Sequence, residues 1–275
     1  VAKNAIFQEF VQAVADKALT VDTEKAGDGE DVVSILDMKA DLDDKILKIG
    51  EKISIRRFEK VTADVVASYI HGGGRIGVLV AGNGASDDAA KEALTNIAMQ
   101  IAAMNPQYIS RDEISADELA KMKEITIDSA LNDPFSLPKP VLSKLIEKAV
   151  AGVWSAEDVA IYEEKKSNMN FLPNFLSKEA KAQLAEIACA DKEEISGNKI
   201  FSGLVEGRIS KQMKEICLLD QVYVKAEDGK QTVAAYLKSV NPALKIAKFV
   251  RFEVGEGMEK KNEDFAAEVA KQMNV

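Results

Sequence analysis

Histidine, cysteine and tryptophan are scarce in this chain of 275 residues, which has one His, two Cys and one Trp. One histidine cannot supply a histidine-rich metal site. Cys189 and Cys217 are too few and too far apart for a disulfide framework or a zinc site. A chain with so little cysteine fits a reducing cytoplasm, which is the location we expect. We also expect no metal and no other cofactor.

Several segments and motifs are missing as well. No apolar run reaches the length of a membrane span, and no N-terminal segment has the pattern of a secretory signal. The sequence has no G-x-x-x-x-G-K-[ST] phosphate loop and no G-x-S-x-G nucleophile elbow. The formal net charge of −9 argues against non-specific nucleic-acid binding, which needs a positive field. We therefore expect neither a membrane nor a nucleic acid as partner.

The first 61 residues combine helical and extended patterns. Apolar residues recur at helical spacing over residues 4–19 and again over residues 31–50, so both stretches are predicted helices. Gly50 is placed to end the second helix, because glycine adopts the left-handed cap conformation without a Cβ penalty. In residues 52–61, isoleucines alternate with polar residues, which predicts a strand.

The only histidine stands in "YIHGGGRIGVLV", residues 69–80, whose glycines fit the G-x-G-x-x-G spelling of a dinucleotide-binding loop. That fingerprint must follow a strand and open a helix. Here residues 65–70 and 76–80 are both rich in β-formers, so a β-hairpin is predicted instead. A second glycine pair, Gly82 and Gly84, leads into a helix that Ser86 is placed to cap. It lacks the third glycine, and we interpret it as a structural turn.

The pattern changes again between about residues 115 and 214, which read as amphipathic helices broken by prolines. A strand is predicted in "AKFVRFEVGEG", residues 247–257. A final short helix is predicted over residues 262–273, because Phe265, Val269 and Met273 share one face. Residues 1–15 resemble residues 89–103, and "RRFE" resembles the later "VRFE". Two copies of a small α+β unit, with a helical insertion, would explain both internal similarities.

These segments together resemble the elongation factor Ts family. The motifs that carry the resemblance are "VAKNAIFQEF", "KIGEKISIRR", "SYIHGGGRIGVLV", "IAMQIAAMNPQYIS" and "FVRFEVGEGMEKKNEDFAAEVAKQ". They stand in family order and cover most of residues 1–122 and 204–275. Several separate motifs agree, so the resemblance is specific, whereas residues from about 130 to 200 do not align.

The resemblance implies an α+β fold with two similar small subdomains, antiparallel sheets, a long helical insertion and a C-terminal helix. The expected domains are a first core subdomain, a second core subdomain in two pieces, an inserted arm of coiled-coil or dimerisation type, and a C-terminal helical module. Their expected bounds are 1–62, then 63–122 with 204–256, then 123–203, and finally 257–275.

The resemblance also implies a guanine-nucleotide exchange factor that binds elongation factor Tu, without covalent chemistry and without binding nucleotide itself. By position in the family motifs, several residues are expected to contact this GTPase. They are Val1, Ile49, Gly50, His71, Gly72, Gly73, Val224, Phe265 and Val269. The residues alone favour a His71 that caps a turn. From the residues alone, Ile49 and Gly50 could simply end a helix, and Val224 could pack in a core.

The family has a T-D-F-V motif whose aspartate and phenylalanine push into the GTPase, and Val1 matches its last residue. A chain without the earlier residues of that motif is expected to exchange nucleotide poorly. Two other classes of function stay open on the sequence: a nucleotide-binding enzyme that uses the glycine-rich turns, and a helical scaffold or dimerisation protein without exchange activity. Self-association through the arm is expected in the second case.

Overall fold

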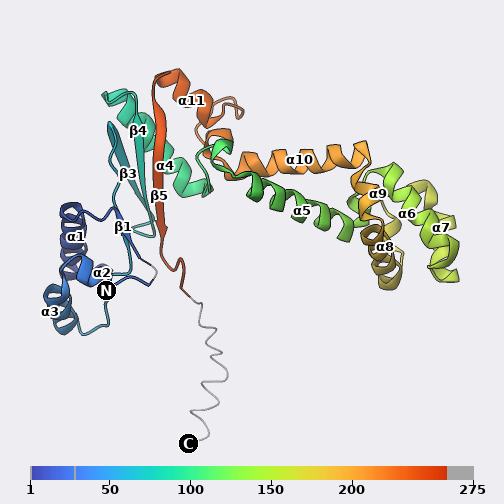
Figure 1. Ribbon diagram of the computed structural model, residues 1–275, viewed down its shortest axis with the longest axis horizontal. Coiled ribbons are helices and arrows are strands. Elements are labelled where there is room, and N and C mark those ends of the chain that lie inside the picture. The colour runs from blue at the N-terminus through green and yellow to red at the C-terminus, as the bar shows by residue number, and fades with distance from the viewer. Residues whose placement is uncertain (1, 28, 259–275) are drawn as a thin grey trace, which may run out of the picture. The chain divides into compact units, whose positions relative to one another are not determined.

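The computed structural model describes residues 2–27 and 29–258 (Figure 1). These residues form an α+β protein with two separate antiparallel sheets, as predicted. By their contacts they divide into two compact units, Val1–Asn105 with Ala235–Val275, and Pro106–Ala234. The expected arm falls wholly inside the second unit, and the domain bounds given above remain a prediction. The helix expected over residues 262–273 lies outside the described residues.

The first part of the first unit is a helical layer with a two-stranded antiparallel sheet, β1 with β2. Its elements are α1 (Ala5–Thr20), β1 (Lys25–Ala26), α2 (Val32–Ile35), α3 (Lys39–Ile49) and β2 (Phe58–Glu59). The side chain of Asn4 accepts a hydrogen bond from the backbone N–H of Ile6 and caps α1. The buried core of this part consists of Phe10, Ala18, Ala26, Val32, Leu36, Met38, Leu42 and Phe58.

Two predictions in this part were wrong. The single helix expected over residues 31–50 is broken into α2 and α3, because Asp37 takes a left-handed conformation with φ of 50°. Of the strand expected over residues 52–61, only Phe58–Glu59 forms a strand in the structure. Ile53 and Ile55 are partly buried against the core, so their alternation reflects one-sided packing of the chain rather than strand pairing.

The second part of the first unit is a three-stranded antiparallel sheet of order β3-β4-β5 with α4 packed on it (Figure 1). Its elements are β3 (Val65–His71), β4 (Ile76–Asn83), α4 (Asp88–Met104), α11 (Val233–Val240) and β5 (Lys245–Glu253). The predicted hairpin, helix and last strand are confirmed. The cap of α4 is Asp87 rather than Ser86, since the Asp87 carboxylate accepts from the Ala90 N–H at 2.8 Å.

The second glycine pair has a packing role. A Cβ on Gly82 would lie 3.0 Å from a methyl group of Leu94 on α4. Gly84 has φ of 92°, and a Cβ there would lie 2.1 Å from the Ala243 carbonyl oxygen. Gly84 therefore needs glycine, and a Cβ at Gly82 would require Leu94 to shift, which confirms the interpretation as a structural turn.

The second unit is helical. Its α-helices are α5 (Ala116–Asn132), α6 (Lys139–Gly152), α7 (Ala156–Lys165), α8 (Lys178–Ala190), α9 (Lys192–Ser196) and α10 (Lys199–Ile216). Short 3₁₀ turns lie at Arg111–Glu113, Pro134–Ser136, Lys166–Asn168, Leu172–Asn174 and Leu218–Asp220. Within residues 2–27 and 29–258, each helix is too short or too polar to span a bilayer.

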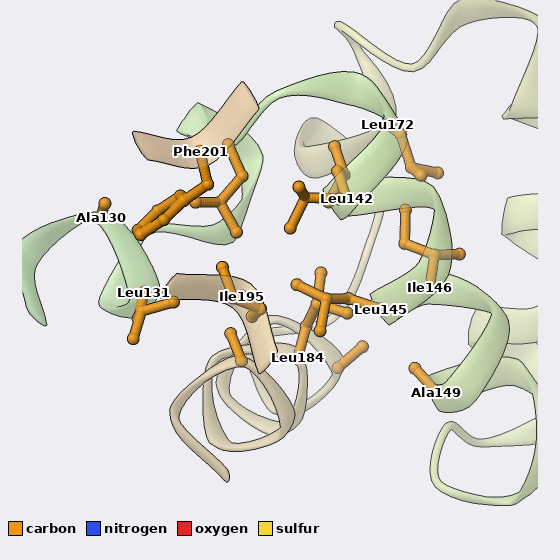
Figure 2. Close-up of a cluster of buried hydrophobic side chains, with 14 of the residues drawn as sticks. Ala130, Leu131, Leu142, Leu145, Ile146, Ala149, Leu172, Leu184, Ile195 and Phe201 are labelled. Carbon is orange, nitrogen blue, oxygen red and sulfur yellow. The ribbon is translucent and has the colours of Figure 1, made fainter. Parts of the chain in front are cut away.

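Residues 127–205 of the second unit have a hydrophobic core of their own. Figure 2 shows side chains of α5, α6, α8, α9 and α10 pointing toward one another, among them Leu131, Leu145, Leu184 and Phe201. Each of these four is at most 2% exposed. Because burying one such side chain contributes roughly 1.5–3 kcal/mol, this cluster is the main source of stability for these helices.

A buried carboxylate joins the starts of two helices in the same region. Asp158 is 5% exposed and accepts hydrogen bonds from the Ser155 hydroxyl at 2.8 Å and from the Ser177 hydroxyl and backbone N–H at 2.9 Å each. Ser155 and Ser177 are the N-caps of α7 and α8. Nearby, the indole N–H of Trp154 donates to the Ala180 carbonyl at 2.9 Å. Asp158 thus holds both caps in place.

We expect Asp158→Ala to lower the free energy of unfolding of the second unit by ~1–3 kcal/mol, because buried donors lose their acceptor. Asp158→Asn should lose less, since its amide oxygen still accepts. Urea unfolding followed by the fluorescence of Trp154, the only tryptophan, reports on this unit. Glu157→Ala, an exposed neighbour on α7, is the control, and an equal loss in that variant would contradict the role given to Asp158.

The effect depends on pH. Burial raises the pKa of Asp158, but the hydrogen bonds from Ser177 and Ser155 outweigh burial and hold that pKa below its ordinary value. The stabilisation is therefore complete above the ordinary pKa of about 4 and is lost as the pH falls through the lower folded pKa. The difference between the native protein and Asp158→Asn should shrink over that acidic range.

Candidate functional site

The stretch around the only histidine folds into a tight β-hairpin. β3 and β4 pair in antiparallel register with His71 opposite Ile76. The backbone N–H groups of Gly74 and Arg75 both donate to the His71 carbonyl, at 3.2 and 3.0 Å. Gly72, Gly73 and Gly74 have φ of 60°, 67° and 96°, which side chains rarely adopt. Since a strand and not a helix follows, these glycines form a turn and not a dinucleotide-binding loop.

The two faces of the hairpin differ. Ala67, Val78 and Val80 are buried on the face that carries α4. Ile70 points to the opposite face, because successive strand residues alternate. It lies opposite Gly77, which in turn lies opposite Phe252 of β5. A Cβ added to Gly77 would meet no heavy atom within 4 Å, so this face is open next to the turn.

His71 is exposed at the end of β3. Its Nδ1 is hydrogen-bonded to the Tyr69 hydroxyl at 3.0 Å, and the two rings lie 5.9 Å apart. This contact orients the imidazole but does not make it a general base of the Ser-His-Asp type, in which a carboxylate holds the ring. The arrangement suits a surface contact rather than acid–base chemistry.

Ile49 and Gly50 lie at the end of α3, as expected. Gly50 is the C-cap with φ of 76°, and its N–H donates to the Ile46 carbonyl at 2.9 Å. The Ile49 side chain is partly buried, whereas Leu47 on the same turn is exposed. A helix end of this kind offers both backbone carbonyls and apolar side chains to a partner.

Val224 lies in the second unit, in the segment after the turn Leu218–Asp220. Its neighbour Tyr223 is buried and donates its backbone N–H to the Gln231 carbonyl at 2.8 Å. Val224 itself is 49% exposed, so it is a surface residue and not a core residue. Its expected contact with the GTPase remains a prediction.

The structure brings His71, Gly72 and Gly73 together in one turn, while Ile49 and Gly50 lie on a different element of the same unit. Val1, Phe265 and Val269 lie outside the described residues. Three exposed apolar side chains were missed: Leu47, Ile70 and Val254, which are 84%, 70% and 73% exposed. For Ile70, alternation along the strand was an available signal. For Val254 no local pattern existed.

The part of the chain that the structure describes contains two free thiols, of which Cys189 is exposed and Cys217 is buried. Within it, His, Cys, Asp and Glu form no group of three that could hold a metal ion. The Cys217 thiol is buried, and burial raises its pKa, with nearby Asp220 adding to the effect. A thiol with a raised pKa is a poor nucleophile at neutral pH.

Comparison of the amino-acid sequence with known proteins finds one family. Residues 1–165 and 159–256 match the family described as Elongation factor TS. Elongation factor Ts of Clostridioides difficile (strain 630) is 37% identical over 279 residues, covering 99% of this chain and 72% of that protein. The corresponding protein of Clostridium novyi (strain NT) is 34% identical over 289 residues, covering 100% of this chain and 72% of its own length.

A third relative, elongation factor Ts of Halothermothrix orenii, is 33% identical over 279 residues and again covers 100% of this chain and 72% of its own. The family match and these relatives, which cover nearly the whole chain, identify it as a translation elongation factor. The chain belongs to the elongation factor Ts family.

The turn can be tested apart from any partner. We expect Gly73→Ala to lower the free energy of unfolding by about 1–2 kcal/mol, because alanine is strained at φ of 67°. Gly77→Ala is the matched control, since its backbone is not left-handed and its Cβ would meet open space. Thermal unfolding of both variants measures the difference. Equal stability of the two would show that the turn relaxes without loss.

Proposed function

We propose that this chain promotes release of GDP from elongation factor Tu by binding the nucleotide-free GTPase more tightly than the GDP-bound form. The observation that carries the proposal is the exposed turn His71–Gly73, with Ile70 beside it, on the edge of a well-packed sheet. The resemblance to the family implies a GTPase contact for His71, Gly72 and Gly73, and Ile70 is added here because of its exposure.

The mechanism is thermodynamic linkage. If the factor binds the nucleotide-free partner more tightly, then it must weaken nucleotide binding by the same ratio. A coupling of this kind typically amounts to about 5- to 150-fold in affinity. It needs no nucleophile, acid or base, so this chain acts as an exchange factor and not as an enzyme of covalent chemistry.

Further contacts are proposed on the same grounds. Ile49 and Gly50 would present the end of α3 to the GTPase, and Val224 would contribute from the second unit. Val1, Phe265 and Val269 are proposed from their positions in the family motifs. The GTPase holds the nucleotide, and this chain is proposed to bind none itself.

The test is release of fluorescently labelled GDP from elongation factor Tu, followed by stopped flow with increasing amounts of this chain. We expect the native chain to accelerate release to a small but measurable extent, in line with the poor exchange expected from the sequence. His71→Ala should raise the concentration that gives half-maximal acceleration about fivefold to thirtyfold, the usual loss when a central interface side chain is truncated. Its melting temperature should stay nearly unchanged, because the side chain is exposed.

Tyr69→Phe is the companion variant. It removes the hydroxyl that holds the His71 ring but keeps the ring contact, so it should cost less than His71→Ala. Failure of the native chain to accelerate GDP release would overturn the proposed function. A large loss of stability in His71→Ala with unaltered release would show that this residue is only structural.

A second candidate function is a helical scaffold that self-associates through the arm, without exchange activity. The arm has an independent core, and Phe171 and Phe175 remain 57% and 51% exposed at its surface. Exposed aromatic side chains are enriched at protein interfaces. This observation favours a binding role for the arm, alone or in addition to exchange.

Deletion of residues 123–203 separates the two candidates. α5 and α10 are neighbours, so a short linker can join their remaining halves. We expect the shortened chain to stay folded and to accelerate GDP release, while any self-association seen by sedimentation is lost. Loss of exchange in a chain that remains folded would favour the scaffold. An insoluble or unfolded remainder would show that the arm belongs to the core.

A further inference from the structure

A turn that follows β5 in the second part of the first unit is hydrogen-bonded to the first part. Residues Glu253–Met258 form this turn, in which Gly255 and Gly257 have φ of 87° and 67°. Its backbone closes on itself through hydrogen bonds from Glu256 N–H to the Glu253 carbonyl at 3.1 Å and from Met258 N–H to the Gly255 carbonyl at 3.3 Å. The side chain of Glu256 accepts from the Glu253 N–H at 3.2 Å.

Two consecutive arginines of the first part hold this turn. Both terminal nitrogens of Arg56 donate to the Glu256 carbonyl oxygen, at 2.9 and 3.0 Å. Arg57 forms an ion pair with the Glu256 carboxylate at 2.8 Å, and its guanidinium lies 4.2 Å from the centre of the Phe252 ring. The Arg57 side chain is only 26% exposed. Arginine suits this position, because a planar guanidinium stacks on a ring and donates from its edge at the same time.

The ion pair is charged at neutral pH. The hydrogen bond from Arg57 is the largest influence on the Glu256 carboxyl and holds its pKa below the ordinary value. A second ion pair, Lys248 of β5 with Glu59 of β2 at 2.6 Å, joins the same two parts of the unit. The contact between the parts is therefore strongly polar and directional.

The held turn is bonded directly to the hairpin. The Val254 N–H donates to the Arg75 carbonyl at 2.9 Å, and the Arg75 N–H donates to the His71 carbonyl at 3.0 Å. On the other side, Arg56 follows Gly50 by only six residues in the sequence. The segment between Gly50 and Arg56 is itself fixed, because Ile53 and Ile55 are partly buried against the core of the first part. The end of α3 is thus joined to the arginines through the chain, and the arginines are joined to His71 through hydrogen bonds of the turn.

We propose that Arg57, together with Arg56, is a positioning residue that keeps the end of α3 and the His71–Arg75 turn in one fixed arrangement, so that both meet the GTPase as a single preformed surface. This inference rests on the proposed function. Two linked contacts bind more tightly when their separation is fixed, because the second contact then forms without further loss of freedom. Arg57 touches neither nucleotide nor partner in this role.

The test is a charge exchange across the pair, with GDP release from elongation factor Tu as the readout. Arg57→Glu and Glu256→Lys should each raise the half-saturating concentration about threefold to tenfold, which is typical of coupled contacts. The rate at saturation should change little. The double variant Arg57→Glu/Glu256→Lys should recover part of the loss, since the ion pair is restored with reversed polarity while the contact with Phe252 and the hydrogen bond from the Glu253 N–H are not.

A second readout distinguishes positioning from mere support of the fold. If the arginines fix two contacts together, then His71→Ala should cost less in the Arg57→Glu background than in the native chain. Arg57→Gln replaces Arg57→Glu if the latter does not fold. Lys166→Glu is the control, because it breaks an exposed ion pair with Glu163 on the arm and should leave exchange unaltered.

The outcomes separate the two proposals. A native chain that fails to accelerate GDP release overturns the proposed function, and this inference with it. An active native chain whose folded Arg57 and Glu256 variants behave like wild type overturns this inference alone. Loss of exchange that only follows a lower melting temperature, with no rescue in the double variant, also overturns it.

Discussion

The packing of α4 against one face of the three-stranded sheet determines which side chains the hairpin presents. Val65, Ala67, Val78 and Val80 are buried on that face, and the absence of a side chain at Gly82 lets Leu94 approach closely. Because side chains alternate along a strand, a slip of one residue would turn Ile70 inward and bury the wrong residues. The exposure of the hairpin surface is therefore a consequence of how the opposite face is buried.

A function based on thermodynamic linkage requires each contact residue only to bind the partner, and requires no acid, base or nucleophile. The proposed contacts are exposed, and the described residues around His71 form an orienting pair with Tyr69 rather than a catalytic group. What such a surface needs is rigidity, because contacts that move independently contribute less to affinity. The glycine turn, the strand pairing and the arginine contacts on the Glu253–Met258 turn all provide it.

Local sequence patterns predicted the hairpin, α4, β5 and the cap at Gly50, because each depends on residues close together in the chain. The break at Asp37 was missed, since an aspartate in the left-handed region has no strong signal in the sequence. The alternation of Ile53 and Ile55 was real but had a different cause. Arg56 and Glu256 are 200 residues apart, so no local pattern reveals their contact. The exposure of Ile70, in contrast, was within reach of the sequence, because Ile70 alternates with the buried Val65 and Ala67 along the strand.

The order of the strands also affects how the protein is made. β4 pairs on one edge with β3, which is its neighbour in the sequence. On its other edge it pairs with β5, which begins at Lys245 and is synthesised only after the whole second unit. At a synthesis rate of roughly 5–20 residues per second, the edge of β4 stays unpaired for about ten to thirty seconds on the ribosome. An open strand edge is a template for wrong pairing. The core of the second unit contains no residue of β5, so it can fold during that interval and shorten the free chain between the two strands.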